Sequence, residues 1–313
     1  MNLENLIGNT PMIEIKYIYN GEEKCIHAKL ECYNYSGSIK DRVIYHILSK
    51  AKRSGNLKDG QPIVEATSGN TGIALASIGA LFGHPVHIFM PDWVSSERQS
   101  LIKMYGATIH LVSREEGGFK AAIEKANKLA IEINALKTDQ FNNLQNVEAH
   151  YYGTAEEILN QYPEVDSFVS GIGTGGTLIG IGKKLKEVKS ADIYGLEPST
   201  LPLLTQGITI GTHKIEGIGD DFIPSIVDLN LLSKVITIDD KDAINMAKKL
   251  SRELGLGVGI SSGANFLAAV LLNETGNIVT VFPDDNKKYI STELSGEIDL
   301  SDELISNKIT LLS

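Results

Sequence analysis

The chain has 313 residues, of which 42% are hydrophobic and 22% are charged, a balance typical of a globular protein with a large buried core. Its 29 basic and 39 acidic side chains give a net charge of −10, which disfavours nucleic acid and anionic membranes as partners. We therefore expect small-molecule ligands.

Strand-like apolar runs alternate with helical periodicity along most of the chain. This alternation predicts an α/β fold in which mostly parallel, twisted sheets are flanked by helices. A polar stretch at 138–153 is the predicted crossing between two such units. In chain order, the predicted strands are 63–66, 86–90, 108–112, 167–171, 193–197, 235–238 and 277–282, and the predicted helices are 71–83, 96–106, 118–133, 178–188 and 242–255.

The start of the chain has no basic segment followed by an apolar run, and no window of about 18 residues is continuously apolar, so we expect a cytoplasmic protein without membrane spans. Cys25 and Cys32 are too few for a disulfide framework. His84 and His87 lack the spacing of metal ligands, so the sequence predicts no metal site.

A glycine-rich turn at 171–177 follows a predicted strand and opens a predicted helix. Backbone N–H groups at such a turn converge on anions, and the hydroxyl groups of Thr174 and Thr177 suit a terminal phosphate. The same turn, with Glu197 at the end of the next strand, also satisfies the pattern of a dinucleotide site, which would make the protein a nicotinamide-dependent dehydrogenase. A tight turn without any ligand is the third interpretation.

A second turn, at 65–72, carries more hydrogen-bonding side chains than a helix cap requires. Thr67, Ser68, Asn70 and Thr71 surround one glycine, whereas a cap needs one such side chain. Hydroxyl and N–H groups at a helix start suit a substrate carboxylate. A redundant cap is the structural alternative.

Lys40 follows a loop of serine and glycine and stands at the start of an apolar helix. A lysine that acts as a nucleophile needs surroundings that lower its pKa or hold it as a Schiff base, and a helix start beside a bound phosphate provides either. Considered alone, Lys40 fits a surface lysine better than a nucleophile.

Together and in this order, these motifs resemble the cysteine synthase and cystathionine β-synthase family of pyridoxal phosphate enzymes. The resemblance covers nearly the whole chain. It implies the tryptophan synthase β-like fold (fold type II), with a smaller subdomain at 35–145 and a larger one formed by 1–34 and 146–313. The segments that carry the resemblance are 7–11, 36–42, 65–76, 170–177, 217–219, 222–224, 259–265 and 283–292.

The resemblance also implies roles for individual residues. Lys40 is the expected internal aldimine lysine and the group that removes the substrate α-proton. Asn70 would bond the phenolic oxygen of the cofactor, and Ser261 would face its pyridine nitrogen, which favours loss of a β-substituent through an aminoacrylate. The expected phosphate cradle is Gly173, Thr174, Gly175, Gly176 and Thr177, and the expected carboxylate ligands are Thr67, Ser68, Thr71 and Gln140.

Asp220 and Asp221 distinguish this chain within the resemblance. Typical cysteine synthases have small residues at these positions, whereas the cystathionine branch has an aromatic residue followed by aspartate, which favours Asp221. A carboxylate there would repel hydrosulfide, and it would pair with the ammonium of a second amino acid or accept a thiol proton. Both aspartates also suit a solvated turn without a catalytic role.

The resemblance predicts an enzyme that acts on amino acids and assembles as a homodimer. We expect β-replacement with cysteine or serine as donor and an amino-acid thiol as acceptor, which with cysteine releases hydrogen sulfide and leaves a thioether such as lanthionine or cystathionine. The alternative is assimilatory cysteine synthase, which converts O-acetylserine and sulfide to cysteine. A catalytically silent relative is disfavoured by the presence of Lys40, Asn70 and Ser261.

Overall fold

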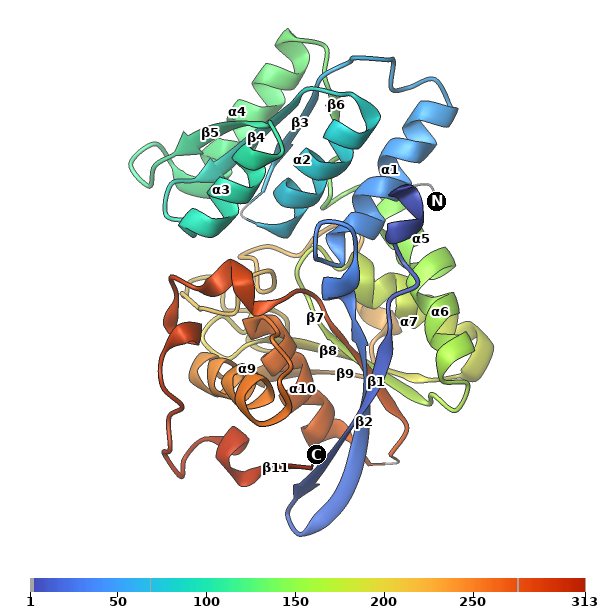
Figure 1. The fold of residues 1–313 in the computed structure, drawn as a ribbon, viewed down its shortest axis with the longest axis vertical. Coiled ribbons are helices and arrows are strands. Elements are labelled where there is room, and N and C mark those ends of the chain that lie inside the picture. The colour runs from blue at the N-terminus through green and yellow to red at the C-terminus, as the bar shows by residue number, and fades with distance from the viewer. Residues whose placement is uncertain (1–2, 68, 275, 313) are drawn as a thin grey trace.

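The computed structural model describes residues 3–67, 69–274 and 276–312, which form two sheets with helices around them (Figure 1). The described part of the larger sheet has seven strands in the order β11-β1-β2-β10-β7-β8-β9, and the smaller has four in the order β5-β4-β3-β6. The strands are β1 Met12–Tyr19, β2 Glu22–Leu30, β3 Ile63–Ala66, β4 Val86–Pro91, β5 Thr108–Val112, β6 Leu136–Lys137, β7 Ser167–Gly171, β8 Asp192–Pro198, β9 Lys234–Ile238, β10 Ile278–Phe282 and β11 Thr310–Leu312.

Helices cover both sheets. The α-helices are α1 Lys40–Arg53, α2 Asn70–Phe82, α3 Ser96–Met104, α4 Gly118–Glu132, α5 Gln145–Ala149, α6 Ala155–Gln161, α7 Gly176–Lys189, α8 Leu203–Gln206, α9 Asp240–Leu254 and α10 Ile260–Leu272. One π-helical turn, His150–Thr154, joins α5 to α6. Short 3-10 turns are Leu3–Leu6, Glu31–Tyr33, Leu229–Leu231, Asn286–Tyr289, Glu293–Ser295 and Ile305–Lys308.

Both sheets are mostly parallel, as the alternation of strands and helices predicts. The four-stranded sheet is parallel throughout its described pairings, and β2, β10, β7, β8 and β9 run parallel in the other. The antiparallel exceptions are β1 with β2 and β1 with β11. A two-residue turn joins β1 to β2, and its Asn20 and Gly21 have φ angles of 53° and 80°, as a tight hairpin requires.

The core lies on both faces of each sheet. In the smaller sheet, Ile73 of α2 and Ile88 of β4 belong to one buried apolar cluster, whereas Val64 of β3 and Ala126 of α4 belong to another. Strands β3 and β10 are buried at every position, which explains their mostly apolar sequences. Among the described helices, none combines the length and hydropathy needed to cross a bilayer.

A buried ionic network attaches helix α1 to the larger sheet unit. Arg42 Nε donates to Glu31 Oε2, and Arg42 Nη1 donates to Glu157 Oε1, each at 2.6 Å. Lys29 Nζ lies 2.7 Å from Glu157 Oε2. Although burial acts in the opposite direction, Arg42 and Lys29 lower the pKa of Glu157 to about 2. The helix that begins with Lys40 is therefore anchored firmly across the boundary between the two units.

The carboxyl ends of β3 and β7 lead into the segments that carry most of the predicted site residues. Ligands of parallel sheets bind at such ends, because turns there lead into helix N-termini. The exact division into subdomains at 34/35 and 145/146 stays a prediction.

Candidate active site

Lys40 opens helix α1 and follows a loop that is bonded to the segment after β10. Ile39 donates its N–H to the Pro283 carbonyl at 2.9 Å, and the Lys288 ammonium donates to the Gly37 carbonyl at 2.6 Å. Gly37 has a φ of 86°, a left-handed conformation that residues with a Cβ rarely adopt. These contacts fix the point at which α1 begins and therefore the position of Lys40.

The surroundings of Lys40 disfavour its ammonium form. Burial lowers the pKa of Lys40 to about 8, and the Asp220 carboxylate opposes that shift. His150 is fully buried, and burial, followed by the nearby Lys40 and Arg42 cations, holds its pKa well below the usual range. A lysine with a pKa of about 8 has an appreciable neutral fraction near pH 7, and the neutral amine is the form that attacks a carbonyl or accepts a proton.

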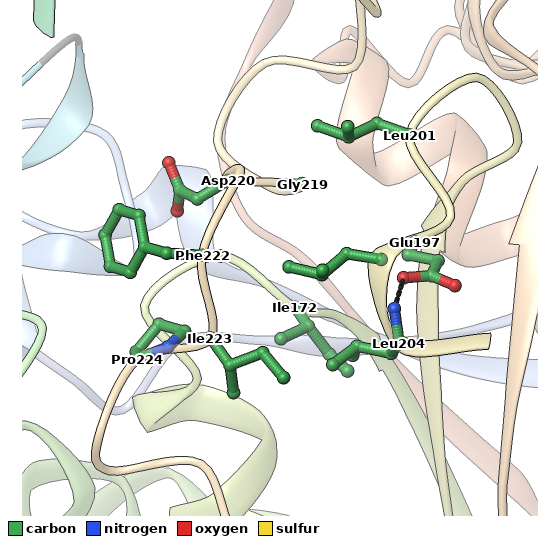
Figure 2. A pocket seen from close by; sticks show the side chains of 11 residues that line it. Ile172, Glu197, Leu201, Leu204, Gly219, Asp220, Phe222, Ile223 and Pro224 are labelled. Carbon is green, nitrogen blue, oxygen red and sulfur yellow. Dashed lines mark hydrogen bonds between the residues drawn. The ribbon is translucent and has the colours of Figure 1, made fainter. Parts of the chain in front are cut away.

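The structure distinguishes the two adjacent aspartates. Asp220 is half-buried, and burial raises its pKa to about 6, with His213 and Lys40 opposing the shift and Asp221 adding to it. Asp221 is exposed. Figure 2 shows the Asp220 carboxylate on the side of its loop away from Leu204. Asp220 therefore interacts electrostatically with Lys40, whereas Asp221, which the resemblance favours, is at the surface.

The glycine-rich turn before α7 is tightly packed. A Cβ on Gly173 would lie 2.1 Å from the Gly217 carbonyl oxygen, and one on Gly176 would lie 1.9 Å from Asn146 Oδ1. Gly175 has a φ of 87°. Packing and backbone conformation therefore require these glycines, and their density alone is no evidence for a ligand. The stronger evidence is the start of α7, whose first N–H groups have no acceptor within the helix and lie at its positive end.

Thr174 and Thr177 add buried hydroxyl groups to this turn. Thr174 Oγ1 accepts from Asn146 Nδ2 at 3.0 Å, and Thr177 Oγ1 lies 3.2 Å from His150 Nε2. A hydroxyl that accepts a bond still carries its own hydrogen for donation. The turn thus offers N–H and O–H donors without an acidic side chain, and this donor set fits a phosphate group.

The turn from β3 into α2 holds the side chains predicted to bind a substrate carboxylate. Thr67 and Thr71 are buried, and Thr71 Oγ1 donates to Gln140 Oε1 at 2.6 Å. The Gly69 N–H donates to Thr67 Oγ1 at 3.2 Å. Gln140, distant in sequence, is thereby brought to the turn as the resemblance implies. Ser68, also predicted here, lies outside the residues that the structure describes.

Asp284 links two residues that the resemblance assigns to the cofactor, Asn70 and Ser261. Asn70 Nδ2 donates to Asp284 Oδ2 at 2.8 Å. Gly259, which precedes the helix of the buried Ser261, donates its N–H to the Asp284 carbonyl at 3.1 Å. Among the described side chains, the buried Oδ1 atoms of Asn70 and Asp284 have no hydrogen-bond partner. Such atoms are costly when unpaired, so the pair fits a site completed by a polar cofactor.

Sequence reasoning missed several residues that contact this site, namely Asp284, Tyr289, His150, Arg98 and Glu216. Asp284 had a partial signal, because it belongs to the segment 283–292 that carries the resemblance. Arg98 had none, since an arginine in an amphipathic helix is usually solvated. Its burial is a consequence of tertiary packing.

The structure argues against the dinucleotide interpretation of the glycine turn. In that interpretation the Glu197 carboxylate would bind a ribose hydroxyl. Both of its oxygens are instead engaged within the protein. Oε2 accepts from the Leu204 N–H at 2.7 Å (Figure 2), and Oε1 accepts from the N–H and the hydroxyl of Thr205. Glu197 thus caps the turn at α8.

Comparison with known proteins identifies the family. A family model described as pyridoxal-phosphate dependent enzyme matches residues 3–284. The chain is 43% identical to cysteine synthase B of Campylobacter jejuni over 298 residues, which are 93% of this chain and 97% of that protein. The chain belongs to the cysteine synthase family of pyridoxal-phosphate dependent enzymes.

Two solved structures show the same architecture. A hydrogen sulfide-producing enzyme from Fusobacterium nucleatum is 53% identical with a TM-score of 0.95, and the match covers 99% of this chain and 96% of that chain. A variant of that enzyme has been solved in complex with an α-aminoacrylate intermediate. The cysteine synthase of Entamoeba histolytica is 38% identical with a TM-score of 0.89, and the match covers 98% of this chain and 94% of that chain.

These comparisons confirm the predicted family, the predicted cofactor and the predicted enzymatic nature of this cysteine synthase relative. Its two mostly parallel sheets are those of the tryptophan synthase β-like fold. Pyridoxal phosphate is the cofactor of the family. The unpaired buried Oδ1 atoms of Asn70 and Asp284 agree with a site for the cofactor ring, and the N–H groups at the start of α7 agree with a site for the cofactor phosphate.

Proposed function

We propose that this chain catalyses β-replacement with L-cysteine as donor and an amino-acid thiol as acceptor, releasing hydrogen sulfide and forming a thioether such as lanthionine or cystathionine. Serine is the alternative donor, with water as the leaving group. The observation that carries the proposal is the half-buried Asp220 carboxylate in the field of Lys40. The 53% identity to a hydrogen sulfide-producing enzyme supports it.

We assign the cofactor to three groups of residues. Lys40 would bind it covalently, the turn at 173–177 would hold its phosphate, and Asn70 and Ser261 would contact its ring. Pyridoxal phosphate supplies the electron sink that lets the α-proton and the β-substituent leave. The turn containing Thr67, Ser68 and Thr71, with Gln140, would bind the substrate carboxylate.

The reaction balances without an oxidant or a reductant. The bond between Cβ and sulfur of the donor breaks, and a bond between Cβ and the acceptor sulfur forms. The donor sulfur leaves first, as hydrosulfide; the proton of the acceptor thiol is later transferred to Asp220 and then to solvent, so that one hydrosulfide and one proton make up the hydrogen sulfide released. Two cysteines therefore give one lanthionine and one hydrogen sulfide.

Asp220 suits this proton transfer better than it suits the use of sulfide. A carboxyl group with a pKa of about 6 is mostly ionised at pH 7, so Asp220 accepts a proton from a thiol and attracts the ammonium of an incoming amino acid. The same charge repels the hydrosulfide anion. Asp221, one residue later, is exposed, so we assign it at most a supporting electrostatic role.

Assimilatory cysteine synthesis from O-acetylserine and sulfide is the second candidate. It is favoured by relatives such as cysteine synthase B of Campylobacter jejuni, at 43% identity. The two candidates share the donor carboxylate site and Lys40, and they differ in the nucleophile that reaches Cβ.

The test compares kcat/KM of the purified holoenzyme for two reactions, cysteine plus homocysteine and O-acetylserine plus sulfide. The proposal expects sulfide release and a thioether product in the first reaction at the higher kcat/KM. Asp220→Asn should impair this first reaction much more than Asp221→Asn does. Efficient cysteine formation in the second reaction, with no sulfide released in the first, would refute the proposal.

By analogy with the family we further infer a cytoplasmic homodimer. Light scattering of the purified holoenzyme measures its mass directly. A mass of one chain, about 34 kDa, would contradict the dimer.

A further inference from the structure

Arg98 of helix α3 is a buried cation that contacts both sheet units. Its side chain belongs to the unit of the smaller sheet, and the residue is 2% exposed. Its Nη1 pairs with Glu216 Oε2, and its guanidinium carbon lies 4.8 Å from the centre of the Tyr289 ring. Glu216 and Tyr289 both belong to the unit of the larger sheet. A buried arginine is stabilised only by partners of this kind, so Arg98 depends on the two units being together.

Arg98 also lies against the turn predicted to bind the substrate carboxylate. A Cβ built on Gly69 would lie 3.4 Å from Arg98 Nε. Among the described side chains, this buried Nε atom has no hydrogen-bond partner. One side chain therefore touches the carboxylate turn and, through Glu216, the loop that carries Asp220.

The loop of Asp220 contacts the unit of the smaller sheet at both of its ends. Glu216 makes the contact at its start. At its end, the Phe222 ring packs edge-on against Phe141 with centroids 5.0 Å apart, and Ser225 Oγ donates to Asn142 Oδ1 at 2.8 Å. Phe141 and Asn142 directly follow Gln140, a predicted carboxylate ligand. Asp220 lies between the two attachments.

A small pocket of about 20 Å³ lies behind this loop, and it is lined mainly by apolar side chains and also by Glu197 and Asp220 (Figure 2). Gly217 and Gly219, on either side of Ile218, have φ angles of 94° and 74°. These left-handed glycines shape the loop, and its contacts with the unit of the smaller sheet lie at its two ends.

We propose that Arg98 is a positioning residue that, through its ion pair with Glu216, couples the carboxylate turn to the loop of Asp220. Binding of an amino-acid carboxylate at the turn then favours the arrangement in which Asp220 faces Lys40. The inference rests on the proposed function only for the catalytic role of Asp220. The coupling itself applies to any amino-acid donor.

The test is a double-mutant cycle on the holoenzyme, with KM of the amino-acid donor as the main readout. Arg98→Met and Glu216→Gln should each raise this KM by about tenfold, while kcat changes less, because 1.4 kcal/mol of lost coupling corresponds to a factor of about ten. The double variant should be no worse than the more impaired single variant. Arg98→Lys, which keeps the charge, should recover part of the loss.

The matched control is Arg114→Met. Arg114 belongs to the same sheet unit and stacks on the Trp93 ring at 4.7 Å, so its loss removes a cation–π contact without touching Glu216. We expect an unchanged KM. Thermal unfolding and the visible absorbance of the bound cofactor show whether each variant is folded and loaded.

Two results would overturn the coupling. One is a double variant whose KM effect is the product of the two single effects. The other is a folded, loaded Arg98→Met variant in which kcat falls and the donor KM does not change. If the wild type releases no sulfide from cysteine, the proposed function fails. The same double-mutant cycle is then measured with O-acetylserine as donor, which tests the coupling independently of the proposed function.

Discussion

Replacing Asp220 by asparagine keeps the size of a half-buried side chain and removes its charge. Folding raises the pKa of Asp220 from 3.8 to about 6. A carboxyl group with a raised pKa binds protons more tightly in the native state, so its contribution to the free energy of unfolding falls as the pH rises from about 4 to about 6 and stays low above that. A shift of about two pKa units corresponds to about 3 kcal/mol. We therefore expect Asp220→Asn to stabilise the cofactor-free protein at pH 7 by up to about 3 kcal/mol.

The assay is urea unfolding at pH 7 and at pH 4, combined with sulfide release from cysteine at pH 7. Most of the stabilisation should disappear at pH 4, because the native carboxyl group is protonated there and the unfolded one, with a pKa of 3.8, is only partly ionised. Sulfide release should fall by at least about a hundredfold, the usual contribution of a general base. The control, Asp221→Asn, should change stability by less than about 0.5 kcal/mol, because that residue is exposed. Equal effects of the two substitutions would refute the assignment of Asp220 as the enclosed carboxylate.

Three further predictions concern the anchoring of the site. Lys40→Ala should abolish turnover and the visible absorbance of a covalently bound cofactor, and a variant that keeps both would exclude Lys40 as the attachment point. Gly176→Ala should destabilise the protein by about 1–3 kcal/mol in chemical unfolding, because its Cβ would overlap Asn146 Oδ1. An unchanged unfolding midpoint would show that the turn accommodates a methyl group at no cost in stability. Arg42→Met leaves Glu31 buried without its cation and should cost about 3–5 kcal/mol in the same assay, whereas a cost below about 1 kcal/mol would contradict the role of the network in anchoring α1.

The sequence predicted the elements that have strong periodicity and clear turn signals. The run at 108–112 is strand β5 as predicted, and the apolar helix after the 65–72 turn is α2. The predicted meeting of Lys40, the carboxylate turn and the glycine turn depended on the family resemblance, because no local pattern fixes which turns share an edge. The antiparallel hairpin of β1 and β2 was not anticipated, although Asn20 and Gly21 provide a recognisable turn signal.

The rest depends on contacts between segments that are far apart in the chain. Neighbouring aspartates look alike in sequence, and which of them is half-buried depends on the path of a loop in which Gly217 and Gly219 have left-handed φ angles. The burial of Arg98 likewise requires Glu216 and Tyr289, which are supplied by the other sheet unit. No periodicity within one helix contains that information.

The central claim is that the chain joins two amino acids through sulfur, with Asp220 serving the incoming thiol. The most direct measurement is incubation of the purified holoenzyme with L-cysteine alone, followed by quantification of sulfide and mass spectrometry of the amino-acid product. We expect sulfide and lanthionine in equal amounts, and almost none of either from Asp220→Asn. No sulfide from cysteine, with rapid formation of cysteine from O-acetylserine and sulfide, would contradict the claim.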